Sequence, residues 1–176
     1  GSCIGCHPAV AAEGAAHHHH GEASAGASCV NCHMPHTTYG LFKAIRSHRV
    51  TVPRPAKSHQ IGKPNACNQC HLDQSPLWAE LTTARWTGRK PEALSGTGVD
   101  IPQSALHLLA GDASQRALAA WAMGWDAAIA ASPGGWQPAL LARLLADPYA
   151  AVRLVAGRSI RKFPGFSQLE HDFVQP

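Results

Sequence analysis

The chain repeats one short pattern three times, as Cys3-Ile4-Gly5-Cys6-His7, Cys29-Val30-Asn31-Cys32-His33 and Cys67-Asn68-Gln69-Cys70-His71. These repeats use all 6 cysteines of the 176-residue sequence, so no cysteine is left over. In a helical turn, residues three and four apart lie on the same side, so each repeat presents two thiols and an imidazole together. We therefore expect each repeat to be a short helical turn that holds one prosthetic group.

The pattern Cys-x-x-Cys-His is the attachment signature of c-type haem. Two thiols add to the two vinyl groups at one edge of a porphyrin, and the histidine that follows reaches the iron from one face. This assigns Cys3, Cys6, Cys29, Cys32, Cys67 and Cys70 to thioether bonds, and His7, His33 and His71 to the proximal side of the iron. The sequence therefore predicts three haem c groups.

Three other interpretations of the cysteines explain less. A disulfide framework gives no reason for a histidine after every second cysteine. Zinc would use two cysteine pairs and leave the third pair without a role. A thioredoxin-like motif needs one Cys-x-x-Cys in an α/β context, and this chain has three in a loop-rich context.

Composition limits what else the chain can be. It is 45% hydrophobic and 15% charged, which favours one compact domain, or two small ones packed together, over disorder. No apolar run reaches the roughly 18 residues of a membrane span. Only 6% of the residues are aromatic, so we expect the porphyrins to replace the missing large side chains of the first seventy residues. The haem propionates offset the formal charge of +4, so no nucleic-acid partner is expected.

The attachment chemistry also indicates a compartment. In bacteria the thioether bonds form after the chain has crossed the inner membrane, so we expect a periplasmic or extracellular protein. No signal peptide is visible, because Gly1-Ser2 leads straight into the first motif. We interpret the sequence as a processed mature chain or a fragment.

The chain divides into a tri-haem cytochrome c domain at 1–75 and an α-helical domain at 76–176. The first part holds all three motifs and ten of the 12 histidines. In the second part, Ser75-Pro76 starts a helix that Gly88 ends, and Asp112 with Gln115 resembles a capping box. Further helices are expected from Ala117 to Ile129, around Leu140–Leu145 and from Asp147 to Phe163. The expected fold is mainly α: a loop-rich multihaem c-type segment, then helices, with no sheet.

The second axial ligand of each iron must come from outside the motifs. The run from His17 to His20 is the first candidate, and His17 and His20, on one helical face, would serve a haem and its neighbour. His48, midway between the second and third motifs, is the next candidate. The remaining histidines outside the motifs are more typical of surface or core positions: His36, His59, His107 and His171. Met34 is badly placed to ligate and Met123 fits a core, so we expect mainly bis-His haems.

The stretch from His17 to Trp86 resembles the C-terminal haem segment of large multihaem cytochromes c related to the pentahaem nitrite reductases and octahaem reductases. The matching features are His-x-His-His at 17–20, Ser-Ala-Gly-Ala-Ser before Cys29, Cys-Val-Asn-Cys-His-Met-Pro at 29–35, Ser-His at 47–48, Pro-Arg-Pro at 53–55 and Gly-Lys-Pro-Asn-Ala-Cys-Asn-Gln-Cys-His at 62–71. The resemblance implies that the distal ligands are His17, His19, His20 and His48, with His18 at a variable position.

The second half resembles HEAT-like helical repeats, more weakly, through Asp147-Pro148-Tyr149-Ala150-Ala151-Val152-Arg153. Such helices follow the haem region in the larger proteins. The upstream haems are absent here, and no Cys-x-x-Cys-Lys motif supplies the lysine-ligated catalytic haem of the nitrite reductases. The reductase activity is therefore not carried over.

Two functions stay open. The first is an electron carrier, not an enzyme, that relays electrons between redox partner proteins. The second is a reductase of nitrite, hydroxylamine or a sulfur oxyanion with one open iron, in which Tyr39, Lys43 and Arg46 would clamp the anion. In either case the helical half offers extended faces for self-association or for docking into a larger multihaem assembly.

Overall fold

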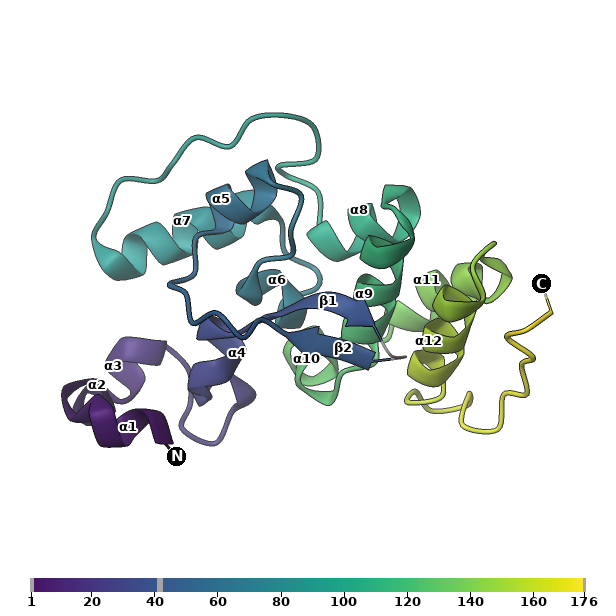
Figure 1. The fold of residues 1–176 in the computed structure, drawn as a ribbon, viewed down its shortest axis with the longest axis horizontal. Helices are drawn as coiled ribbons and strands as arrows, with labels where there is room; N and C mark the ends of the chain where they lie inside the picture. The colour runs from purple at the N-terminus through teal and green to yellow at the C-terminus, as the bar shows by residue number, and fades with distance from the viewer. Residues whose placement is uncertain (1, 41–42, 176) are drawn as a thin grey trace.

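The computed structural model describes residues 2–40 and 43–175, which form a mainly helical fold with one small sheet (Figure 1). In the first half the elements are α1 (Ser2–Cys6), α2 (Pro8–Glu13), α3 (Ala15–His18), η1 (Ala25–Ala27), α4 (Cys29–His33), β1 (His36–Gly40), β2 (Lys43–Arg46), α5 (Pro55–Gln60) and α6 (Ala66–Cys70). In the second half they are α7 (Pro76–Thr87), α8 (Gln103–Ala110), α9 (Ala113–Met123), α10 (Asp126–Ala131), α11 (Gln137–Arg143), η2 (Leu144–Ala146) and α12 (Ala150–Ile160). Within the described ranges, each helix is too short or too polar to span a bilayer.

Each cysteine motif forms the short helical turn that its spacing predicts. The three turns are α1, α4 and α6. In α6 the side chain of Asn65 accepts a hydrogen bond from the backbone N–H of Asn68, which caps the first turn. Buried Ser132, at the end of α10, binds the far end of the same motif: its hydroxyl donates to the carbonyl of Cys70 at 2.9 Å and accepts from the N–H of Leu72 at 2.8 Å. The third motif is therefore anchored to the second half of the chain.

The predicted helix signals of the second half are confirmed at two places. Ser75 caps α7 by accepting from the N–H of Trp78, and Gly88 ends the helix in the left-handed conformation at φ 66°. Asp112 and Gln115 form a reciprocal capping box at the start of α9.

The single helix expected from Ala117 to Ile129 is wrong, because the chain breaks into α9 and α10. Gly124 stands at the break, and a Cβ there would lie only 2.5 Å from the Ser159 side chain of α12. Glycine therefore lets α12 approach the end of α9, and the chain turns before α10. The sequence interpretation also missed α8, which precedes α9.

The hydrophobic core lies almost entirely in the second half. Leu108, Met123, Leu141 and Ile160 are all at most 1% exposed, and α9 packs against both α8 and α12. Among the described residues of the first 75, Leu72 alone is a buried member of this cluster, and partly buried Tyr39 packs against it. This distribution agrees with the expectation that the motif-bearing segment has no protein core of its own.

The expectation of no sheet is wrong, since β1 and β2 form an antiparallel two-stranded sheet. Thr37, Thr38 and Tyr39 favour strand geometry. A hairpin this short is marginal alone and needs packing against other elements. Both strands contact α9, and Tyr39 packs on the core of the second half. The signal was missed because most of the stabilisation comes from residues distant in sequence.

The division at residue 75 and the HEAT-like character of the second half both stay predictions. α7 packs against α5, so the first helix after the proposed boundary contacts the motif-bearing half.

Candidate haem-binding site

The cysteines of the second and third motifs lie close together. α4 contacts α6, and all 6 cysteines are free thiols. Burial raises the pKa of Cys67 to about 12 and that of Cys70 to about 11, and nearby Cys32 adds to both rises. Within residues 2–40 and 43–175, no group of three or more His, Cys, Asp or Glu side chains is arranged to hold a metal ion.

Two motif histidines each face a histidine of the His17–His20 run. The ring centroids of His17 and His33 lie 6.2 Å apart with planes 14° from parallel. Those of His20 and His71 lie 6.1 Å apart at 30°. An imidazole nitrogen binds a transition metal at about 2 Å, and the ring centroid lies about 1 Å behind it, so two rings on opposite sides of one metal lie about 6 Å apart. Both spacings fit an iron between the rings.

Three of these four rings have a partner near Nδ1. His33 Nδ1 lies 2.8 Å from the carbonyl oxygen of Thr51, and the Nδ1 of His20 contacts the carbonyl oxygen of His18. His17 Nδ1 lies 3.6 Å from a carboxylate oxygen of Glu13. A proton held at Nδ1 leaves the lone pair at Nε2, which is the tautomer an iron ligand needs. These contacts therefore prepare the rings as ligands.

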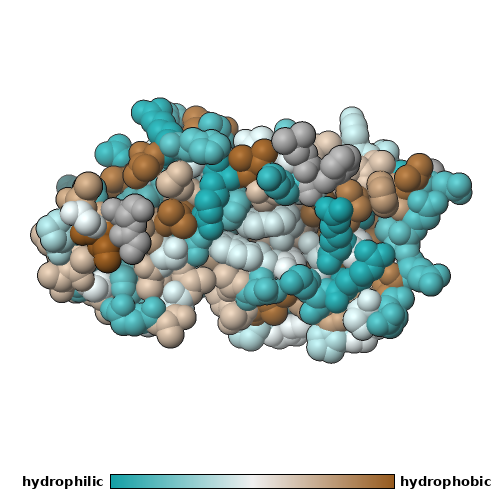
Figure 2. Space-filling model, turned by 60° about the horizontal axis from the view of Figure 1, so that its bottom comes forward, coloured by the Kyte–Doolittle hydropathy of each residue, from teal (hydrophilic) through white to brown (hydrophobic). Residues whose placement is uncertain are grey.

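Tryptophans of α7 flank the His20–His71 pair. Trp78 lies 5.1 Å from the ring of His71, and Trp86 lies 6.0 Å from that of His20 and stacks on His19 at 4.3 Å. Figure 2 shows hydrophobic side chains on the surface at the end of the molecule that holds the N-terminal helices. The exposed large apolar residues of the motif-bearing half and α7 are Ile4, Val50, Val52, Ile61, Leu77, Leu81 and Trp86. Exposed apolar side chains of this kind can cover the faces of a porphyrin.

The remaining candidate ligands are not brought into ring pairs of this kind. α3 ends at His18, and His19 takes the left-handed conformation at φ 55°, so His17 and His20 do not share a helical face as expected. His48 is exposed in the bend after β2, and His7 is exposed after α1. The assignments of His7, His19 and His48 stay predictions.

The histidines outside the predicted ligand set lie elsewhere. His36 is a core residue: its ring packs 4.2 Å from Trp121 and 5.6 Å from Trp125, and burial lowers its pKa to about 4. Nδ1 of His36 is buried without a hydrogen-bond partner. His107 lies on α8, where burial lowers its pKa.

Met123 is fully buried in the core, as its place on an apolar helix indicated. Met34 directly follows α4.

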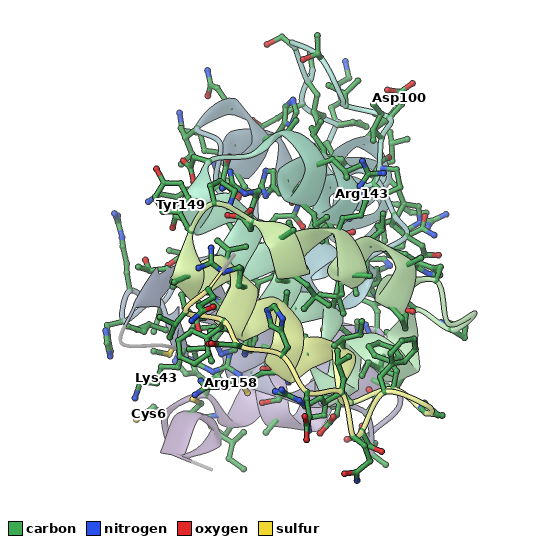
Figure 3. All side chains as sticks on the ribbon, turned by 90° about the vertical axis from the view of Figure 1, so that its right-hand side faces the viewer. Cys6, Lys43, Asp100, Arg143, Tyr149 and Arg158 are labelled. Atoms are coloured by element: carbon green, nitrogen blue, oxygen red, sulfur yellow. The ribbon has the colours of Figure 1, made fainter. Side chains whose placement is uncertain are left out.

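Arg46, considered with Tyr39 and Lys43 for an anion clamp, binds the backbone around the second motif. Its guanidinium donates to the carbonyl oxygens of Val30 at 2.8 Å and Met34 at 3.1 Å. Tyr39 packs on the helical core, and Lys43 is exposed at the start of β2 (Figure 3). The three side chains have separate surroundings because the unexpected hairpin carries them.

Sequence reasoning also missed the residues that hold the ligand-bearing turns. A Cβ at Gly26 would overlap the imidazole of His20, so only glycine fits at that point. Asn31 Nδ2 donates to the carbonyl oxygen of Ala25 at 2.7 Å, which fixes η1 to α4. The Ser-Ala-Gly-Ala-Ser lead into Cys29 was the available signal.

Paired thiols on helical turns and facing imidazoles about one metal apart are features that a c-type cytochrome requires. Residues 7–93 match the family model of cytochrome c552, a range that contains the second and third motifs complete and His7 of the first. The match supports a multihaem c-type cytochrome family and implies haem c. Neither a curated protein nor a solved structure matched the chain.

Proposed function

We propose that this protein carries three covalent haem c groups and relays electrons between redox partner proteins in the periplasm or outside the cell. The observation that carries the proposal is the pair of histidine spacings, 6.2 Å for His17–His33 and 6.1 Å for His20–His71. Each pair joins a proximal motif histidine to a distal one. His19 and His48 remain the candidates to pair with His7.

Residues of the chain hold both axial ligands of the second haem position in one orientation. Thr51 and Glu13 lie next to the Nδ1 atoms of His33 and His17 on opposite sides of the second haem position. Such partners raise the basicity of an imidazole, and two basic imidazoles favour the ferric state. Haem c supplies a one-electron carrier at each position. With both axial positions filled by histidine, low-potential electron transfer needs no substrate site.

The closeness of α4 and α6 supports transfer between the second and third haems. Cys32 is near enough to Cys67 and Cys70 to influence the pKa of both thiols. His17 and His20, which face the two motifs, are three residues apart in sequence. Two porphyrins attached at these positions are therefore neighbours, which is what a short electron relay requires.

The helical half is proposed as an interaction platform, for self-association or for docking into a larger multihaem assembly. Its core of α8, α9, α11 and α12 does not depend on the motif cysteines, so it presents a surface of its own.

Optical spectra of the ferric and ferrous holoprotein, recorded with and without carbon monoxide, test the proposal. Six-coordinate low-spin haems with no change on adding carbon monoxide are expected of a relay. A high-spin fraction that binds carbon monoxide would overturn the relay and favour the alternative, a reductase of nitrite, hydroxylamine or a sulfur oxyanion with one open iron.

A further inference from the structure

The third position of the second and third motifs carries a long amide side chain. These residues are Asn31 in Cys29-Val30-Asn31-Cys32-His33 and Gln69 in Cys67-Asn68-Gln69-Cys70-His71. The equivalent residue of the first motif is Gly5, and a Cβ there would meet open space. Neither amide is needed for haem attachment, which uses only the cysteines and the histidine.

Both amides bind the β1–β2 hairpin, and they bind opposite strands of it. Gln69 Oε1 accepts from the backbone N–H of His36 at 3.1 Å, and its Nε2 donates to the carbonyl oxygen of the same residue. Asn31 Oδ1 accepts from Arg46 Nη2 at 2.5 Å. His36 and Arg46 are cross-strand partners at one end of the sheet. The two motif helices therefore bind the same cross-strand pair of the hairpin, which we call the His36–Arg46 rung.

This rung is held rigidly from both sides. Arg46 also donates to two carbonyl oxygens of the second motif, those of Val30 within α4 and of Met34 just after it. His36 and Gln69 are buried, at 9% and 4% exposed, and the His36 ring packs on Trp121 of α9. Buried hydrogen bonds without competing water are costly to break. The path from α4 through Arg46, His36 and Gln69 to α6 is therefore a stiff bracket.

We propose that Asn31, Arg46, His36 and Gln69 are positioning residues that fix the distance and angle between the second and third haems. The proposal rests on the proposed function, because it requires haems at both motifs. The bracket acts on the geometry between the two haems and leaves the axial ligands of each unchanged. Loss of either amide link frees one motif helix from the hairpin and weakens the interaction between the two irons.

Electron paramagnetic resonance of the ferric holoprotein tests the proposal through the spin–spin interaction between neighbouring low-spin haems. The variants are Gln69→Leu and Asn31→Leu, which remove the amide and keep a similar volume. Asn31→Asp retains the acceptor for Arg46 and loses the donor to Ala25, as Asn31→Leu also does, so these two variants differ only at the Arg46 contact. Gly5→Asn, at the same position of the first motif, is the matched control.

We expect the interaction signal of the wild type to be lost in Gln69→Leu and in Asn31→Leu, and kept in Asn31→Asp and Gly5→Asn. Optical spectra should still show every haem low-spin in Gln69→Leu and Gly5→Asn, whose residues make no contact with η1. An interaction that survives in both leucine variants, or that the wild type lacks, overturns the bracket. If Gln69→Leu does not mature with its full haem content, Asn31→Leu alone decides. Failure of the proposed function is separately visible, since the wild type would then lack low-spin haems.

Discussion

Substituting Gly26 by alanine should remove the distal ligand of the third haem. The new Cβ would overlap the His20 ring and lie 2.8 Å from its Nε2. Ordinary contact needs about 3.5 Å, so Nε2 must move by about 0.7 Å. A metal–ligand bond tolerates only about 0.2 Å, so the bond between His20 and the iron cannot survive a shift of this size. One haem should become five-coordinate and high-spin, and it should bind carbon monoxide in optical titration.

Gly21→Ala is the matched control, because Gly21 lies in the same segment and a Cβ there meets nothing within 4 Å. It should keep the low-spin spectrum of the wild type. A Gly26→Ala protein that stays fully low-spin and ignores carbon monoxide would refute the assignment of His20. A high-spin signal in both variants would show that substitution anywhere in this segment disturbs the haem ligand. It would contradict the explanation by overlap between the new Cβ and the His20 ring.

Three further outcomes are expected. Glu80 is fully buried and accepts a hydrogen bond from Arg89 at 2.5 Å. Glu80→Leu should therefore lower the free energy of unfolding in a denaturant titration by about 3 kcal/mol. This is the low end of the loss for breaking a buried ion pair, because Arg89 reaches solvent. Burial first, and the charge of Arg46 second, lower the pKa of His36 to about 4, so His36 is neutral in the folded protein. The free energy of unfolding should therefore fall as pH drops from about 6.5 to about 4. His36→Leu should reduce this pH dependence. Glu13→Gln should raise the midpoint potential of the second haem by about 20 mV in a redox titration, because the exposed Glu13 carboxylate beside Nδ1 of His17 stabilises the ferric state by about 0.5 kcal/mol.

A control variant or a contradicting result goes with each of these three predictions. Asp126→Asn removes an exposed pair with Lys162 and should change stability by less than about 0.5 kcal/mol; a loss as large as that of Glu80→Leu would contradict the burial argument. A wild type whose stability does not change between about pH 6.5 and pH 4 would contradict the neutral buried His36. Glu22 lies next to His18, so Glu22→Gln should leave the haem potentials unchanged. A shift in potential as large as that of Glu13→Gln would contradict the role of Glu13.

Sequence reasoning succeeded where the signal is local. The three motif turns follow from cysteine spacing, and the caps at Ser75 and Asp112 follow from residues within one turn. The core residues of α9 and α12 were also visible, because apolar periodicity is a short-range pattern.

The hairpin and the bracket could not be predicted, because their stabilising contacts join residues far apart in the chain. Gln69 binds His36 from 33 residues away, and Arg46 binds Asn31 from 15 away. The shared helical face of His17 and His20 failed for a local reason, the left-handed turn at His19. Even so, the turn leaves the two rings opposite different motif histidines, which the histidine run alone did not specify.

The haem content of the purified holoprotein shows whether the three cysteine motifs carry haem. A pyridine haemochrome assay, set against the protein concentration and the intact mass, counts covalent haem per chain. We predict three covalent haems per chain, with all 6 cysteines consumed in thioether bonds. Two or fewer haems per chain, or a colourless folded protein that carries zinc, would contradict this prediction.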